Sequence, residues 1–179
     1  MPHVNIEELL DEYARGKRDF GGMELKEANL FEADLRRINL QGSQLQRAYF
    51  PYAKLSYANL SQANLHQAQL GDALLHHADL SYASLVAANL CRASLRYANL
   101  HRVDLRGANL QRANLYKADL TNANLSDADL SRANLEQANL TGAILAGSNF
   151  FQAGMVDFTG TYPDARNRYP DGYFQGRQS

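Results

Sequence analysis

Three arginines spaced twenty residues apart, Arg92, Arg112 and Arg132, are the side chains of this chain with the clearest binding chemistry. A guanidinium group presents a rigid fork of donors that fits carboxylates and phosphates. If the fold returns the chain to the same place every twenty residues, the three side chains stand close together. The row is then either a site for an anion or an acidic partner, or a set of solvated arginines with stacked planes.

A second group of residues combines cations with aromatic rings, again at intervals close to twenty residues. Its candidate binding residues are Arg96, Tyr97, Tyr116 and Lys117, and the same positions of earlier repeats hold Arg36, Arg37, Tyr57, His76 and His77. Basic groups among rings are able to contact nucleic acid by neutralising phosphates and stacking on bases. However, 18 Lys+Arg against 19 Asp+Glu leave a net charge of -1. This balance disfavours a nucleic-acid partner and favours an ordinary polar wall.

Other kinds of site find little support in the sequence. Cys91 is the only cysteine, which excludes an intrachain disulfide and a cysteine-based zinc site. His76 and His77 are adjacent and poorly placed to share one metal ion, and Asp127 and Asp129 lack the burial that shifts a carboxyl pKa for acid-base work. No glycine-rich phosphate loop, nucleophile elbow or dinucleotide fingerprint is present. The sequence therefore predicts no catalytic residue, metal or cofactor.

The elements that position these side chains belong to a repeat of five residues. Every fifth residue from Phe20 to Met155 is apolar, which makes 28 positions, and 24 of them are leucine. Two residues before each of them, from Ala28 to Ala153, the residue is usually alanine. The register never slips across this stretch, so we expect one continuous solenoid.

This spacing fits neither an amphipathic helix nor a regular strand. On a helix, leucines five residues apart are separated by about 140° and form no stripe. A strand requires strict alternation, whereas these apolar residues are two and then three apart. We therefore expect a short extended step followed by a turn, repeated so that alanine and leucine both face inward.

Runs such as Ala58-Asn59-Leu60-Ser61-Gln62 and Ala108-Asn109-Leu110-Gln111-Arg112 resemble the pentapeptide-repeat family, whose motif is A-(N/D)-L-x-x. The resemblance covers residues 18–157. It implies an all-β fold, a right-handed quadrilateral parallel β-helix with four repeats per coil and about seven coils. It also implies that residues twenty apart stack, including the three arginines.

The two open ends of such a coil need covering. We expect residues 1–17 to form an N-terminal capping helix, with Asn5 as its N-cap and Gly16 as its stop. Residues 9–20 are similar to leaders that precede many cyanobacterial pentapeptide-repeat domains. Residues 158–179 are expected to be a largely irregular tail, whose aromatic residues either cap the coil or cover a homodimer contact at its end.

The function expected from these features is that of a non-enzymatic structural or protein-interaction module, acting on an unknown protein partner through the outer faces of a rigid solenoid. The resemblance offers an alternative, because some family members mimic DNA and protect DNA gyrase from quinolones. Those members rely on strongly acidic surfaces, which this chain lacks. With no recognisable signal peptide and no long apolar segment, the sequence predicts a cytoplasmic protein with no membrane partner.

Overall fold

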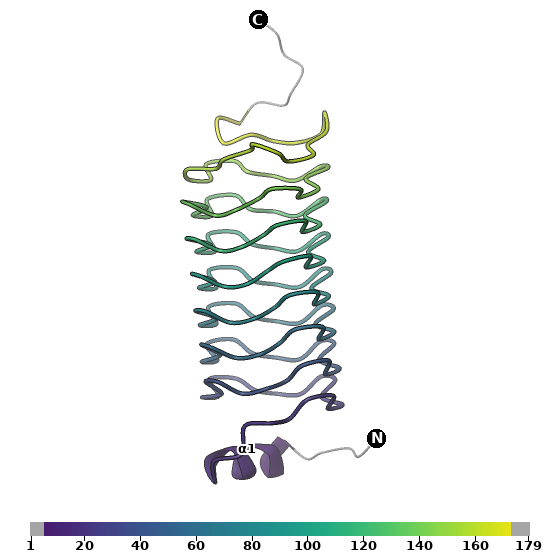
Figure 1. Cartoon of the computed structure of the whole chain (residues 1–179), viewed down its shortest axis with the longest axis vertical. Helices are drawn as coiled ribbons and strands as arrows, with labels where there is room; N and C mark the ends of the chain where they lie inside the picture. Colours follow the sequence, from purple (N-terminus) through teal and green to yellow (C-terminus); the bar gives the residue numbers. More distant parts are fainter. Residues whose placement is uncertain (1–5, 173–179) are drawn as a thin grey trace, which may run out of the picture.

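A computed structural model describes residues 6–172 of the chain. The one helix among these residues, α1 (Ile6–Ala14), lies across the end of an upright stack of coils (Figure 1). Successive coils are joined by single-residue parallel bridges between residues twenty apart, from Asp19↔Asn39 to Asn134↔Gly154. The twenty-residue offset shows that four five-residue repeats make one coil, so residues twenty apart do stack.

The chain changes direction between repeats through a four-residue β-turn that begins at the central leucine. In the turn starting at Leu85, the N–H of Ala88 donates to the carbonyl of Leu85 at 3.0 Å. The third residue of this turn, Ala87, has φ 56°. A positive φ at the third residue defines a type II turn, which glycine or asparagine adopts most easily. Here arginine, tyrosine, glutamine and histidine also occupy this position, so the turns display large polar side chains at the corners of the coil.

Backbone hydrogen bonds between coils hold the stack together. The N–H of Leu85 donates to the carbonyl of Asp104 at 2.7 Å, and the N–H of Ala87 donates to that of Arg106 at 2.9 Å. Asparagine side chains extend the ladder in several places; Asn99 Nδ2, for example, donates to Asp79 Oδ1 at 3.0 Å. The same oxygen of many Asn and Asp residues also accepts the N–H two residues later, which fixes the start of the turn.

The interior is built from the repeating apolar residues. Every central residue from Phe20 to Phe150 is at most 2% exposed, and most alanines two positions before them are also buried. Where Ser43 replaces alanine, its hydroxyl accepts the N–H of Met23 at 3.1 Å and donates to the carbonyl of Phe20 at 3.3 Å. The expectation fails at Met155, which occupies a central position but is 75% exposed and has φ 51°.

The end near the N-terminus is covered by α1. Leu9 is fully buried, and Ile6, Leu10 and Tyr13 pack beside it on the core. The helix stops at a Schellman motif, in which Gly16 N–H donates to Tyr13 O and Lys17 N–H to Glu12 O. The stop at Gly16 is thus as expected, whereas the expected N-cap, Asn5, lies outside the described residues.

The opposite end is closed by residues 158–172, which are more regular than expected. Tyr162 and Arg168 make parallel bridges to Ile144 and Asn149, and thereby continue the ladder at shortened offsets. The ring of Phe158 packs edge-on against Phe150, with ring centroids 5.1 Å apart. Phe158 therefore covers the end of the core in place of Met155, which turns outward.

A buried asparagine fixes this closing segment. Asn167 is 1% exposed; its amide nitrogen donates to the carbonyl of Leu145 and, at 3.4 Å, to that of Ser148. Its side-chain oxygen accepts the N–H of Asp164. Within residues 6–172, no helix has the length and hydropathy needed to span a membrane.

Candidate partner-binding site

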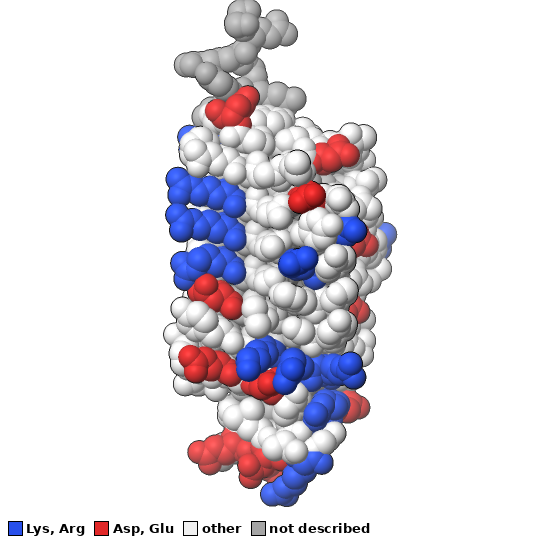
Figure 2. Space-filling view, turned by 90° about the vertical axis from the view of Figure 1, so that its left-hand side faces the viewer, with Lys and Arg blue, Asp and Glu red and all other residues white. Residues whose placement is uncertain are grey.

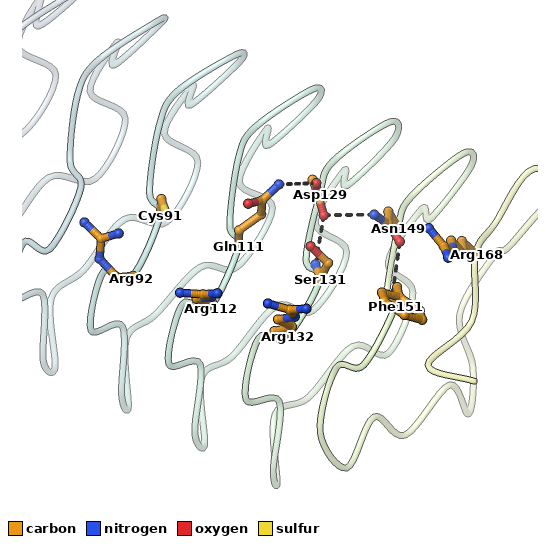
Figure 3. Close-up of a pocket in the computed structure, with 10 residues that line it drawn as sticks. All are labelled: Cys91, Arg92, Gln111, Arg112, Asp129, Ser131, Arg132, Asn149, Phe151 and Arg168. Carbon is orange, nitrogen blue, oxygen red and sulfur yellow. Dashed lines mark hydrogen bonds between the residues drawn. The ribbon is translucent and has the colours of Figure 1, made fainter. Parts of the chain in front are cut away.

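The three arginines predicted from the sequence come together along one edge of the coil. Arg92, Arg112 and Arg132 extend from the turns of three successive coils (Figure 3). Figure 2 shows basic side chains standing one above another along an edge of the shaft. Arg92, Arg112 and Arg132 border an open hollow of about 360 Å³, here called the arginine groove. The groove is lined by Cys91, Arg92, Gln111, Arg112, Asp129, Ser131, Arg132, Asn149, Phe151 and Arg168.

The lowest arginine of the groove is neutralised within the protein. Arg92 donates from Nε to Asp72 Oδ1 at 2.7 Å and from a terminal nitrogen to Oδ2 at 2.6 Å. The hydrogen bond from Arg92 holds the pKa of Asp72 below its ordinary value of 3.8, and the carboxylate raises the pKa of Arg92. This pair therefore adds little net charge to the groove.

The next two arginines have no carboxylate partner. Arg132 donates from Nε to the neutral side-chain oxygen of Gln152 at 3.0 Å. Arg112 is the one arginine among residues 6–172 whose side chain has no hydrogen bond, ion pair or ring contact. Both side chains are exposed, so their donors remain available to a ligand.

The single carboxylate in the groove is already occupied. Asp129 Oδ1 accepts the N–H of Ser131 at 2.9 Å and the amide of Asn149 at 3.1 Å. Its Oδ2 accepts the amide of Gln111 at 2.6 Å. Asp129 is thus held by neutral donors of the groove wall and makes no ion pair with an arginine, as the dashed lines of Figure 3 indicate.

The upper end of the groove holds a fourth arginine that repeat spacing does not predict. Arg168 lies in the closing segment, with its guanidinium carbon 4.1 Å from the centroid of the Phe151 ring. Its offset from Asn149 is nineteen residues rather than twenty, because the register has changed after Met155. The only sequence signal for it is its basic side chain in a tail rich in aromatic residues.

The second predicted group forms a separate cluster at another corner. Tyr57, His77 and Tyr97 stack in one column, with centroids 4.9 and 4.7 Å apart and planes within 1°. The amine of Lys117 is 5.3 Å from the centroid of the Tyr116 ring, and the guanidinium of Arg96 is 5.4 Å from it. The ring faces are taken up by neighbouring rings and cations, which leaves little free face for a nucleic-acid base to stack on.

One histidine of this corner, His76, is partly buried beside a cationic side chain. Burial lowers the pKa of His76 below its ordinary value of 6.5, and the nearby Arg96 and His77 lower it further. His76 is therefore mainly neutral at pH 7. Among residues 6–172, no three His, Cys, Asp or Glu side chains are grouped so that they would hold a metal ion.

A leucine-lined coil with four repeats per coil defines this chain as a solenoid repeat protein. The chain belongs to the pentapeptide-repeat family: the family model for pentapeptide repeats matches residues 28–67, 73–112 and 118–153, with 8 copies. Together with the likeness to the trypsin-treated form of QnrB1 described below, this confirms the right-handed quadrilateral β-helix.

Several solved structures are similar to the chain. HetL, a pentapeptide-repeat protein involved in heterocyst differentiation regulation in the cyanobacterium Nostoc sp. strain PCC 7120, is 29% identical over 97% of this chain and 100% of its own, with a TM-score of 0.48. Rfr23 from the cyanobacterium Cyanothece 51142 is 26% identical over 90% of this chain and 97% of its own, with a TM-score of 0.31.

A trypsin-treated form of QnrB1, a plasmid-mediated fluoroquinolone resistance protein, is 17% identical over 82% of this chain and 89% of its own, with a TM-score of 0.51. At this identity the likeness shows the fold alone. The comparison with curated proteins gives no significant match.

Proposed function

We propose that the chain is a non-enzymatic interaction module that binds a protein partner through the outside of its coil, with the arginine groove as the binding face. The observation that carries this proposal is Arg112, an exposed guanidinium without a partner between two further arginines. Like charges on adjacent coils, about 4.8 Å apart, repel one another, and an acidic partner would relieve this repulsion.

The composition of the interior supports a role in binding rather than catalysis. The central positions from Phe20 to Phe150 hold leucine and phenylalanine with exposures of at most 2%. The buried polar side chains among residues 6–172 are four serines and Asn167. None of them is an acid, a base or a thiol, so this buried set contains no general acid or base, and no base that would activate a serine hydroxyl as a nucleophile.

Mimicry of DNA has no comparable observation in its favour. A DNA mimic requires rows of carboxylates, whereas the groove is lined by four arginines and one occupied aspartate. The acidic residues that flank arginines elsewhere, such as Asp34 and Asp104, are paired with them. We therefore favour an acidic partner over gyrase.

The proposal is tested by affinity capture from an extract of the organism that encodes the chain. The wild-type protein is compared with the double variant Arg112→Gln/Arg132→Gln. The matched control is Arg47→Gln/Arg102→Gln, which changes the net charge equally at the same turn position on other corners. We expect the groove variant to lose partners that the control retains. If both variants retain the same partners, the groove is not the binding face.

A further inference from the structure

We propose, on the basis of the function proposed above, that the group recognised in the arginine groove is a phosphate monoester on an extended segment of the partner protein. We further propose that an apolar side chain of the same segment lies on an aromatic cluster farther along the same edge. The cluster consists of Phe31, Tyr49 and Tyr52.

The charge of the groove fits a dianion better than a carboxylate. Arg112, Arg132 and Arg168 carry three positive charges that no carboxylate pairs, and Asp129 contributes one negative charge. Arg92 is balanced by Asp72. A phosphate monoester carries about −1.5 to −2 charges at pH 7 and three acceptor oxygens. It would balance the remaining charge, whereas one carboxylate would leave about half of it.

The geometry of the groove also suits a phosphate group. Arg112 and Arg132 occupy equivalent turn positions on adjacent coils, and their side chains lie next to each other (Figure 3). Two guanidinium forks at the coil spacing of about 4.8 Å are able to donate to different oxygens of one tetrahedral group. The hollow of about 360 Å³ leaves room for the side chain that carries the phosphate.

The aromatic cluster supplies a second, apolar contact on this edge. The rings of Phe31 and Tyr49 lie 6.1 Å apart, and those of Phe31 and Tyr52 lie 5.9 Å apart and are nearly perpendicular. The three side chains are 46%, 43% and 52% exposed. Grouped exposed rings of this kind are suited to covering an apolar side chain of a partner.

The distance between the two contacts indicates the length of the bound segment. Tyr52 and Arg112 belong to the same corner column, with Asp72 and Arg92 between them, and are therefore three coils apart. At about 4.8 Å per coil the separation is about 14 Å, which an extended chain spans in about four residues. The segment therefore carries its phosphorylated and apolar residues about four positions apart.

A protein segment fits this arrangement better than a lipid headgroup. The phosphate and apolar contacts follow one another in a line along an edge, with the neutral Asp72–Arg92 pair between them. A membrane surface favours a broad field of basic residues, whereas Glu32 and Asp72 are members of this same column. An extended peptide needs only the line of contacts.

The test measures peptide binding to the full chain by fluorescence anisotropy. The probes are labelled peptides with leucine four residues before or four residues after a phosphoserine, together with twins that carry serine or glutamate in its place. In at least one order, we expect the phosphopeptide to bind about tenfold tighter than the serine twin, because charge-assisted hydrogen bonds are formed, with the glutamate twin between them. Replacing the leucine by glycine should also weaken binding.

The variants used for affinity capture locate the bound phosphate. Arg112→Gln/Arg132→Gln should reduce the advantage of the phosphopeptide over its serine twin about tenfold, whereas Arg47→Gln/Arg102→Gln should leave it unchanged. Circular dichroism melts check that both variants remain folded. Equal binding of the phosphopeptide and its serine twin, or an advantage that survives in the groove variant, would refute the proposal.

Two further outcomes distinguish a phosphate on a protein from a phosphate on a lipid, and the phosphate inference from the proposed function. Vesicles of phosphatidylcholine with phosphatidylserine and phosphoinositide are tested in parallel; binding to these vesicles without binding to the phosphopeptide would assign the groove to lipid and overturn the proposal. If the phosphopeptide fails to bind while Arg112→Gln/Arg132→Gln still loses its captured partners, the phosphate inference is wrong and the proposed function stands.

Discussion

Arg92 and Arg112 occupy equivalent positions on consecutive coils, but their environments differ because of one residue. The corner residue below Arg92 is Asp72, which pairs with it through two hydrogen bonds. The residue below Arg112 is Arg92 itself, and the residue above is Arg132. A carboxylate in a column thus neutralises the arginine of the next coil, and a run of arginines without one leaves charge available to a partner.

The Asp72–Arg92 pair should make the stability of the fold depend on pH in the acidic range. The pKa of Asp72 in the folded protein is held below 3.8 by Arg92. Its ionised form therefore stabilises the fold fully above pH 3.8, and this contribution is lost as the pH falls through the lowered pKa. We expect Asp72→Asn to be less stable than wild type at pH 7, with the difference shrinking below pH 3.8. Urea denaturation at several pH values measures it, and a difference that stays constant down to pH 2.5 would contradict the expectation.

At the scale of the element, the repeated type II turn determines which side chains stand at the corners of the coil. The backbone of its third residue is left-handed, which costs a non-glycine residue about 1–2 kcal/mol. The chain nevertheless places arginine, tyrosine and histidine there, including Arg112 with φ 56° and His77 with φ 55°. The interior packing and the bonds between coils must offset this cost, and in return the corners carry long side chains at fixed spacing.

Ala87→Gly tests this cost at a turn where the side chain contributes little. Ala87 is exposed and has φ 56°, and glycine adopts this conformation without strain. Relief of the strain, less the entropy that glycine adds to the unfolded chain, should stabilise the protein by roughly 0.5–1 kcal/mol. Thermal and urea denaturation report the change.

Ala146→Gly is the control for this substitution, because Ala146 is the second residue of its turn and does not have a positive φ. Here only the entropic cost of glycine applies, so the variant should be less stable than wild type by about 0.4–1 kcal/mol. Two substitutions with the same chemistry should therefore act in opposite directions. If both destabilise the protein, strain at the third turn residue is not a significant cost in this coil.

At the scale of the whole molecule, the five-residue period predicts the body of the solenoid and not its closure. The period and the size of the apolar residues predict which positions are buried, and the central residues from Phe20 to Phe150 are buried as predicted. The pattern cannot show that Met155 leaves the core and that Phe158 replaces it. Position 155 still holds an apolar residue, as the period requires, but the backbone changes direction there.

The candidate site was predictable to a similar degree. The twenty-residue interval was sufficient to predict that Arg92, Arg112 and Arg132 lie along one edge of the coil. It does not predict Arg168, which reaches the groove through the shifted register of the closing segment. Nor does it show which arginine is paired, because that depends on side-chain conformation rather than on position in the repeat.

Removal of the closing segment should open the coil at that end. A chain ending at Asp157 lacks Phe158, which covers Phe150, and Asn167, which donates to the carbonyl of Leu145. The amides of Leu145 and Phe150 also lose their acceptors, the carbonyls of Tyr162 and Arg168. We expect their hydrogen exchange to accelerate strongly, while the amide of Leu85 in mid-shaft stays protected, since each coil depends mainly on its neighbours.

The same truncation distinguishes a cap from a cover for a dimer contact. Exposure of Phe150 and the last coil gives two molecules complementary apolar ends, so the chain ending at Asp157 should self-associate more than the full chain in sedimentation experiments. A chain ending at Gly172, which retains every residue of the closing segment that the structure describes, should behave as the full chain does. If the full chain is a dimer and the chain ending at Asp157 is a monomer, residues 158–172 form the contact between subunits rather than a cap that prevents self-association.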